Sequence, residues 1–118
     1  MKRVKEQRYL QNRKVNGKRT SSMNESQISH PSSLSATSGD SEGEINLVWE
    51  PVKNAHTYVV QKSKGSKHPL KWMNEDIVTK SNCTVTKLKS RHKYWFRVAA
   101  VGRSGQGPWS KFVQKNAP

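Results

Sequence analysis

The feature that most constrains the fold is one long segment of alternating side chains near the carboxyl end of the chain. In residues 94–102 every second residue is apolar, and these are expected to face inward: Tyr94, Phe96, Val98 and Ala100. A period of two is that of a β-strand, because successive side chains point to opposite faces of a sheet. A glycine-rich stretch at 102–107 follows and predicts a loop before another strand.

Shorter segments upstream show the same period. Their inward-facing residues are expected to be Ile45, Leu47 and Trp49, then Tyr58, Val60 and the stem of Lys62, then Cys83 and Val85. We also predict an edge strand after Pro31, a short strand with Trp72, and a final strand with Phe112 and Val113, either of which could face inward. About seven strands with turns between them, and no helix after residue 31, predict an all-β, seven-stranded antiparallel sandwich of two sheets.

The first 30 residues differ in composition from the rest. They hold few large apolar side chains and carry eight Lys and Arg against two Glu. Eleven of the 22 residues at 20–41 are Ser or Thr. Such a stretch cannot bury enough apolar surface to offset the entropy lost on ordering it. We therefore expect 1–30 to be a mostly disordered, basic, Ser-rich tail or linker, and 31–118 to fold as one domain.

The chain is strongly basic, with a formal net charge of +14 over 118 residues. A balance of this size attracts polyanions such as nucleic acid, anionic lipid or acidic polysaccharide. The alternative is a soluble surface whose charge serves no dedicated partner, since net charge bears on association and not on fold. Charge by itself therefore indicates a class of partners without selecting one.

The residue types that carry catalysis are not arranged for it in this sequence. Ser104 and Ser110 have no base and orienting acid nearby, and the four histidines are scattered without metal-ligand spacing. The adjacent carboxylates Glu75 and Asp76 would point opposite ways on an extended segment. The single cysteine, Cys83, excludes an internal disulfide and is expected to be a small buried hydrophobe. We expect no enzyme activity, metal, cofactor or small-molecule substrate.

Hydropathy indicates how the chain relates to membranes and compartments. No apolar run is long enough to cross a bilayer, so we expect no membrane span. The basic amino terminus is not followed by the apolar segment of a signal peptide. The chain as written is therefore expected to stay inside the cell or to be a fragment of a longer protein. One cysteine leaves the compartment open, because a disulfide-free domain suits the cytosol and secretion alike.

Residues 31–118 resemble a fibronectin type III domain, an immunoglobulin-like sandwich. The segments that carry the resemblance are, in chain order, 31–36, 45–51, 55–61, 88–94, 96–102 and 105–110. Trp49 matches the family's buried tryptophan, and Leu88 stands six residues ahead of Tyr94, as in the tyrosine corner. The resemblance implies that the Tyr94 hydroxyl hydrogen-bonds to backbone upstream and locks the turn. The stretch from Ala100 to Ser110 looks more like bacterial members than animal ones.

The resemblance implies a recognition or spacer role. Members of this family are mostly extracellular or cell-surface adhesion modules, receptor parts, or spacers beside bacterial glycan-degrading enzymes. Some bind integrins through Arg-Gly-Asp in the loop after the sixth strand. The corresponding loop here, 102–107, contains no acidic residue, so integrin binding of that kind is not implied.

Candidate interaction residues fall in three segments of the sequence. They are Trp95 and Arg97 facing outward on the long strand, Arg103 and Gln106 in the loop after it, and Lys87, Lys89 and Arg91 around the tyrosine corner. A basic strip with an exposed tryptophan could bind single-stranded nucleic acid by charge and stacking, or a sulfated glycan by charge. The alternative is that Trp95 packs across its sheet and Arg97 covers it by a cation–π contact.

Three functional hypotheses follow from these patterns. The first is a non-catalytic protein-interaction, adhesion or spacer module, with a protein as the expected partner. The second, from a different class, is a polyanion binder that uses the basic tail and surface on nucleic acid or acidic glycan. The third is an accessory domain cut from a larger secreted enzyme.

Overall fold

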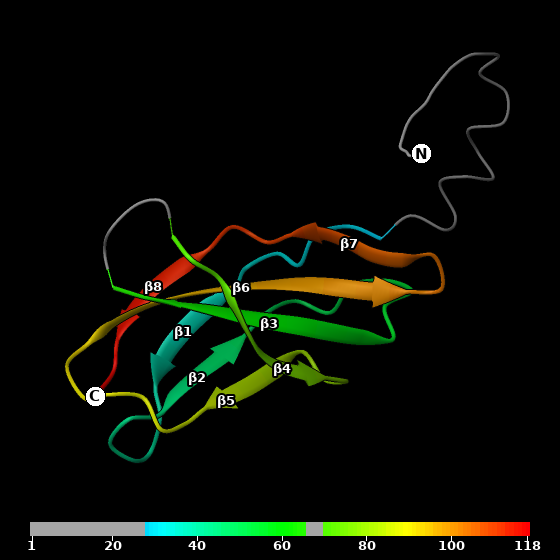
Figure 1. Ribbon diagram of the computed structural model, residues 1–118. Coiled ribbons are helices and arrows are strands. Elements are labelled where there is room, and N and C mark those ends of the chain that lie inside the picture. Colours follow the sequence, from blue (N-terminus) through cyan, green and yellow to red (C-terminus); the bar gives the residue numbers. More distant parts are fainter. Residues whose placement is uncertain (1–27, 66–69) are drawn as a thin grey trace, which may run out of the picture.

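The computed structural model describes residues 28–65 and 70–118, and these form eight strands in two packed sheets (Figure 1). The strands are β1 (Ser35–Ser38), β2 (Ile45–Val48), β3 (Thr57–Lys64), β4 (Met73–Val78), β5 (Asn82–Val85), β6 (Lys93–Gly102), β7 (Gly105–Trp109) and β8 (Val113–Asn116). These residues contain no helix, and so none long and apolar enough to cross a membrane. The expected all-β antiparallel sandwich is confirmed.

The two sheets are unequal in size. One has three strands in the order β1-β2-β5, and the other has five, in which β4, β3, β6 and β7 follow one another and β8 also pairs with β6. All pairs are antiparallel, and β3 and β6 keep a regular register over eight residue pairs, with Tyr58 opposite Ala100 and Val60 opposite Val98. Paired residues share a face, so the apolar alternation of both strands points to the same side of the sheet.

Eight strands appear where seven were expected because the last one is broken. Both β7 and β8 pair with β6: Trp109 lies opposite Ala99 and Val113 lies opposite Phe96. Three residues, 110–112, therefore face the two residues between Phe96 and Ala99, which is the geometry of a β-bulge. Ser110 bridges the break. Its N–H donates to the Val98 carbonyl at 2.8 Å, and its hydroxyl accepts from the Val98 N–H at 3.0 Å.

The break also determines which of Phe112 and Val113 faces the core, which the alternation left open. Val113 packs against the core, whereas Phe112 is 50% exposed on the outer face. The expected position of Trp72 is corrected slightly: the pairing of β3 with β4 ends at Met73, so Trp72 lies just before the strand. Ring contacts rather than ladder hydrogen bonds hold it, as described below.

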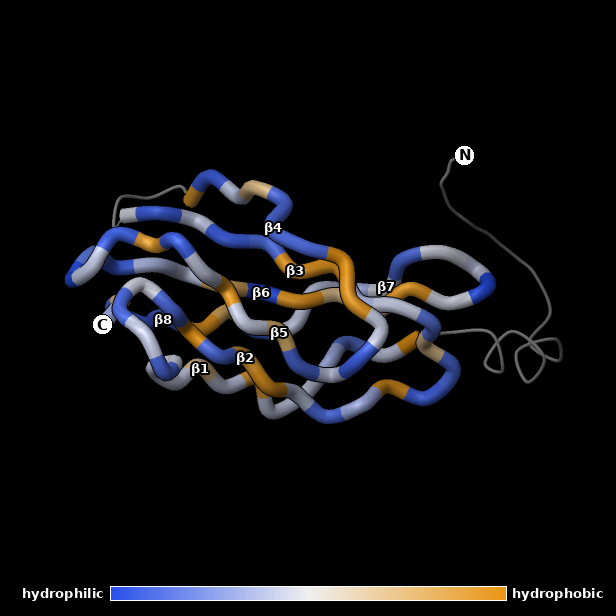
Figure 2. The backbone as a smooth tube through the Cα atoms, turned by 90° about the horizontal axis from the view of Figure 1, so that it is seen from below, coloured by the Kyte–Doolittle hydropathy of each residue, from blue (hydrophilic) through white to orange (hydrophobic). Residues whose placement is uncertain are grey.

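The core lies between the sheets and contains the residues that the sequence pattern turned inward. Trp49, Tyr58, Tyr94 and Phe96 are all buried, and the Trp49 and Tyr58 rings meet edge to face at 5.3 Å between centroids. Figure 2 shows hydrophobic and hydrophilic residues alternating along the strands that enclose this space. At the amino-terminal side, Ile28 also packs against the core. Residues 1–27 lie outside the described residues, so the tail and the domain boundary at 30/31 stay predictions.

The tyrosine corner implied by the resemblance is present. The Tyr94 hydroxyl accepts a hydrogen bond from the Lys89 N–H at 2.8 Å. The Leu88 N–H donates to the Gly43 carbonyl at 3.1 Å, which ties the loop before β6 to the turn before β2. Gly43 has φ +78°, and a Cβ there would lie 2.6 Å from the Leu88 carbonyl oxygen, so only glycine allows this approach.

Cys83 is buried on β5, as its alternation predicted. Its Sγ lies 3.9 Å from Asp76 Oδ2 on the neighbouring β4. Burial first, and then the negative charges of Asp76 and Glu75, raise the pKa of the Cys83 thiol from 9.0 to about 11. The side chain is therefore a neutral thiol at physiological pH and a poor nucleophile.

Tyr94→Phe should destabilise the domain by about 2 kcal/mol, because the Lys89 N–H loses its acceptor in a partly buried site. Urea unfolding at neutral pH measures the change. Lys89→Ala is the matched control: it keeps the backbone N–H and should shift stability by less than about 0.5 kcal/mol. Equal effects of the two substitutions would show that the hydroxyl does not hold the loop.

Cys83 should also give the domain a specific alkaline sensitivity. Its folded-state pKa lies above its unfolded value, so the unfolded chain releases this proton first as the pH rises from 9 to 11. The stability that the neutral thiol contributes is thus complete below pH 9 and lost toward pH 11. Between these values, urea midpoints should fall more steeply for the wild type than for Cys83→Ala. Parallel curves would contradict the raised pKa, since other groups titrate in both proteins.

Candidate interaction surface

The outer face of the five-stranded sheet carries an arginine between two tryptophans. Arg97 extends outward from β6, and its guanidinium carbon lies 4.5 Å from the ring centroid of Trp72 and 4.2 Å from that of Trp109. Trp72 precedes the edge strand β4 and Trp109 ends β7, so the Trp–Arg–Trp stack (Trp72, Arg97, Trp109) spans the width of the sheet. A cation held against an aromatic face is attracted by the ring's negative quadrupole.

Hydrogen bonds beneath the stack fix the arginine. The Arg97 Nε–H donates to Gln61 Oε1 at 2.9 Å, and Gln61 Nε2 donates to Asn74 Oδ1 at 2.8 Å. The register places these three residues side by side on β6, β3 and β4. Burial lowers the pKa of the Arg97 guanidinium, which still remains charged at neutral pH. The planar group is therefore held rigidly rather than free in solvent.

Two more aromatic side chains extend this surface. The Trp95 indole N–H donates to the Gly65 carbonyl at 2.6 Å. Phe112 meets Trp95 edge to face at 5.4 Å and lies 6.0 Å from Trp72, between ring centroids. We call Trp72, Trp95, Trp109 and Phe112 the aromatic cluster. Phe112 is its most exposed member, while the three tryptophans are half-buried.

Part of this surface was predictable from the sequence. Trp95 does pack across its sheet, as one alternative proposed, whereas Arg97 stacks on Trp72 and Trp109, two partners that the sequence pattern did not join to it. The sequence signal for Trp72 and Trp109 was weak. Each of these residues stands next to an irregular stretch, where alternation does not show to which face a ring points. The alternation placed Phe112 in the final strand but did not indicate which face of the sheet its side chain lies on.

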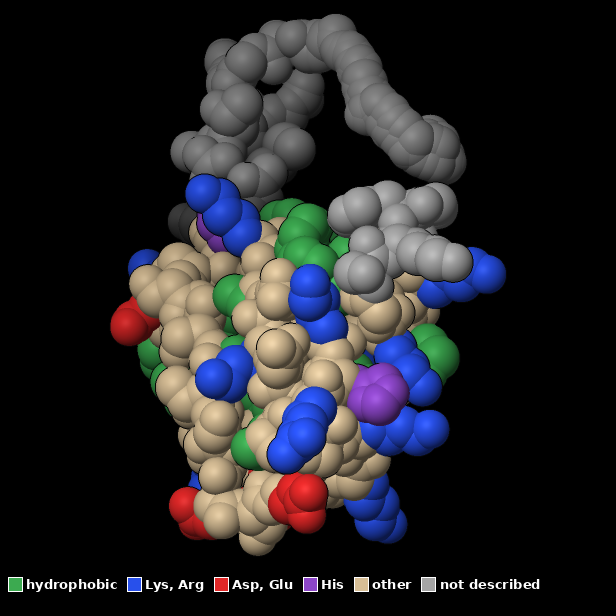
Figure 3. All heavy atoms as spheres, turned by 90° about the vertical axis from the view of Figure 1, so that its left-hand side faces the viewer, with side chains coloured by type: hydrophobic (Ala, Val, Ile, Leu, Met, Phe, Trp, Pro, Cys, Tyr) green, Lys and Arg blue, Asp and Glu red, His purple; other side chains and the backbone are tan. Residues whose placement is uncertain are grey.

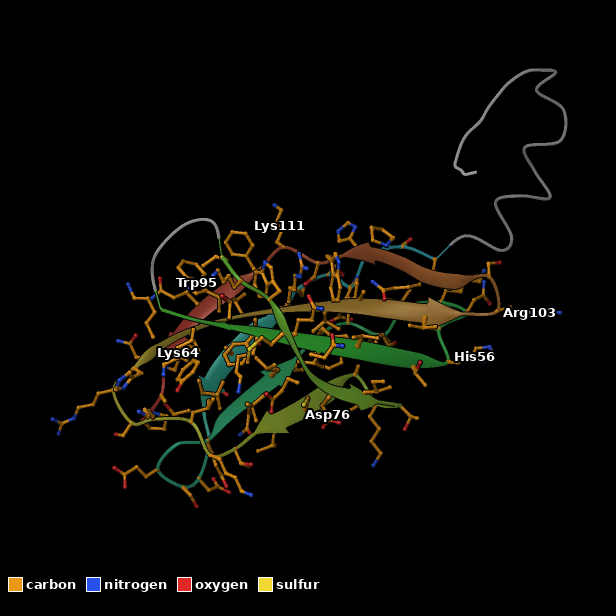
Figure 4. All side chains as sticks on the ribbon, viewed as in Figure 1. His56, Lys64, Asp76, Trp95, Arg103 and Lys111 are labelled. Atoms are coloured by element: carbon orange, nitrogen blue, oxygen red, sulfur yellow. The ribbon has the colours of Figure 1, made fainter. Side chains whose placement is uncertain are left out.

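The structure does not bring the other predicted interaction residues to this face. Arg103 and Gln106 lie at the β6–β7 hairpin, where Gln106 pairs with Val101. Lys87, Lys89 and Arg91 lie in the loop between β5 and β6. Figure 4 places Arg103 and His56 at one end of the domain and Lys64 at the other, with Trp95 and Lys111 along the outer face.

The carboxylates Glu75 and Asp76 are not arranged as an acid–base pair. Glu75 forms an ion pair with Lys62 at 2.9 Å, while Asp76 accepts from its neighbour's backbone N–H, that of Ile77, at 2.8 Å and faces Cys83. The two adjacent side chains thus have different partners, as expected for an extended segment. Within residues 28–65 and 70–118, no three His, Cys, Asp or Glu side chains gather as metal ligands would.

Arg97→Lys should test the stack, because lysine keeps the charge and loses the flat guanidinium and its Nε hydrogen bond. We expect a loss of about 1 kcal/mol in urea unfolding, with a change in the near-ultraviolet circular dichroism of the tryptophans. Arg103→Lys, at an exposed hairpin position, is the matched control and should leave both unchanged. A stability equal to wild type for Arg97→Lys would mean that the stack contributes nothing.

Comparison with known proteins agrees with this architecture. The family model described as "Fibronectin type III domain" matches residues 29–116. No curated protein sequence matches the chain. Among solved structures, an Fn3-like protein from Clostridium thermocellum is 28% identical with a TM-score of 0.63, and the match covers 73% of this chain and 88% of that chain. The FN5 domain of Drosophila Lar is 27% identical with a TM-score of 0.62, over 75% of this chain and 95% of that chain.

A third structure is more distant in sequence. The fn3 domain of the human collagen alpha-1(XX) chain is 17% identical with a TM-score of 0.62, over 77% of this chain and 86% of that chain, and it shows the fold alone. The bacterial and the insect structures are almost equally similar, so these comparisons do not separate bacterial from animal members. With both sheets, the buried tryptophan and the tyrosine corner in place, the chain belongs to the fibronectin type III domain family.

Proposed function

We propose that this chain is a non-catalytic interaction module that binds a protein partner on its aromatic cluster. Family membership supports the general role, since these domains are commonly non-catalytic interaction or spacer modules. The observation that carries the specific role is the partly exposed cluster of four aromatic side chains with an arginine held among them. Aromatic residues and arginine are enriched where protein interfaces are most fully buried.

The neighbouring residues enlarge the apolar surface. Ile77 on β4 is 68% exposed and pairs with Val59, which in turn pairs with Ala99 opposite Trp109. Paired residues share a face, so an apolar row runs from the edge strand to the aromatic cluster. Ala99 is fully buried and Val59 is half-buried, so the exposed apolar surface of this row is that of Ile77 at one end and the partly exposed Trp109 at the other. Exposed apolar side chains near the aromatic cluster add to the surface that a partner could cover.

The fixed geometry of the cluster favours binding. The Trp95 indole and the Arg97 guanidinium already have hydrogen-bond partners, and the rings contact one another. A partner that covers them immobilises few side chains that were mobile before, so less conformational entropy opposes association. Because the guanidinium covers a face of both Trp72 and Trp109, these rings are poorly disposed to stack on nucleic-acid bases.

Charge selects the chemistry of the partner. Lys71 and Lys111 are exposed and stand next in sequence to Trp72 and Phe112. Lysines at the rim of an apolar surface favour a partner whose own apolar patch is bordered by carboxylates, mainly by accelerating association. The expected partner is therefore a protein whose apolar patch has an acidic rim. A spacer, in contrast, would need no partner on any face.

A photo-crosslinking side chain at position 112 tests this proposal in the organism that makes the protein. The expected result is one discrete protein adduct that unlabelled wild-type domain suppresses and that domain carrying Phe112→Ser does not. Position 84 is the matched control, because Thr84 is exposed on the outer face of the three-stranded sheet. The absence of an adduct at 112, or the same adducts from both positions, would contradict the proposal and leave the spacer role.

A further inference from the structure

A second surface lies at the end of the domain away from the β6–β7 hairpin. Basic side chains from three strands and one loop gather there, and Figure 3 shows Lys and Arg spread over this end, with Asp and Glu at the lower edge and at the left of the view. We call this surface the basic end: Lys64, Lys87, Lys89, Arg91, Lys93 and Lys115. Lys64 and Lys115 lie on opposite sides of Tyr94 in the sheet register, so their backbones are about 10 Å apart.

The loop that carries half of these charges is rigid. The Lys89 N–H bonds to the Tyr94 hydroxyl, and the His92 N–H donates to the Lys89 carbonyl at 3.1 Å. The last residues of the chain hold the loop from the other side. The Arg91 N–H donates to the Ala117 carbonyl at 2.8 Å, and the Ala117 N–H donates to the His92 carbonyl at 2.9 Å. The charges are therefore displayed from a fixed scaffold and not from a flexible loop.

Two of the loop's basic residues occupy strained backbone positions. Lys87 has φ 62° and Arg91 has φ 67°, both in the left-handed region that glycine and asparagine adopt more readily. Long basic side chains have no conformational advantage there. Strain of this kind persists where the surrounding structure imposes it and is concentrated at functional sites. The hydrogen bonds of Leu88, Lys89 and Arg91 impose this backbone, so the φ values show how firmly the loop is held.

These charges are not neutralised within the described part of the chain. The ion pair found there joins Lys62 to Glu75, and no residue of the basic end has a carboxylate partner. Asp40, Glu42 and Glu44 belong to the turn that Gly43 ties to the loop, so acids border this end on one side. An anionic ligand would therefore cross the end of the sheet at β3, β6 and β8 and reach Lys87 and Lys89 from the side opposite that turn.

We propose that the basic end binds a linear acidic polysaccharide, sulfated or carboxylated, through lysine-dominated charge contacts. Five of its six cations are lysines, which act as point charges on flexible stems and need no planar ligand. Single-stranded nucleic acid would require rings for its bases to stack on. Tyr94 is buried and Trp95 is engaged by Gly65 and Phe112, so this end offers no such platform.

Titration with a heparin oligosaccharide at low and physiological salt tests the proposal on the full chain. The double variant Lys87→Glu/Lys89→Glu should bind about tenfold more weakly or worse, and the loss should shrink as salt rises. Lys53→Glu/Arg103→Glu changes the net charge equally and should bind like the wild type within about twofold. Because both variants keep residues 1–27, the comparison isolates the basic end. Equal weakening by the two variants would overturn the proposal.

Three further measurements test the role of Lys87, the class of the polyanion, and the independence of this surface from the aromatic cluster. Lys87→Gly should raise the urea midpoint by relieving the positive φ and still weaken heparin binding; unchanged binding would overturn the role of Lys87. An oligodeoxythymidylate bound more tightly than heparin, with the same dependence on Lys87 and Lys89, would overturn the polysaccharide assignment in favour of nucleic acid. Phe112→Ser should leave heparin binding intact, which separates this proposal from the one for the aromatic cluster.

Discussion

The pairing of β6 with strands on both of its edges is the constraint on which the rest of the structure depends. One edge pairs with β3 over eight residues and the other with β7 and β8. Once that register is set, Tyr94, Phe96 and Val98 must point into the core, and Trp95 and Arg97 must point away from it. The same ten residues therefore build the core and the centre of the outer face.

The bulge at Ser110 links these two roles. It adds one residue to the last strand, and this residue turns Val113 inward and leaves Phe112 beside Trp95 and Trp72. The Ser110 hydroxyl and N–H keep both backbone groups of Val98 satisfied at the break, so the irregularity leaves no buried polar group of Val98 unpaired. A strand without this bulge would place the opposite set of side chains on each face.

The two proposed surfaces rest on different physics. The aromatic cluster is a pre-organised, partly apolar face on which burial would supply most of the affinity. The basic end carries cationic side chains that have no carboxylate partner among the residues that the structure describes, half of them on a hydrogen-bonded loop, and salt would control affinity there. They adjoin each other, since Trp95 of the aromatic cluster pairs with Ser63, the neighbour of Lys64, and its indole N–H donates to the Gly65 carbonyl. A protein on the aromatic cluster and a polyanion on the basic end would therefore lie next to each other.

Alternation within each segment was enough to assign the strands and the buried faces of Trp49, Tyr58 and Phe96, because the side-chain period of a strand is a local property. The final strand shows the limit of that reasoning: a bulge shifts the period by one, and only the partner strand reveals it. The Trp–Arg–Trp stack joins residues far apart in the sequence. The basic end adds Lys64 and Lys115, through cross-strand register, to the basic residues that the sequence already groups around the tyrosine corner. Local pattern thus determined what each strand buries, while tertiary pairing decided which exposed side chains form a surface.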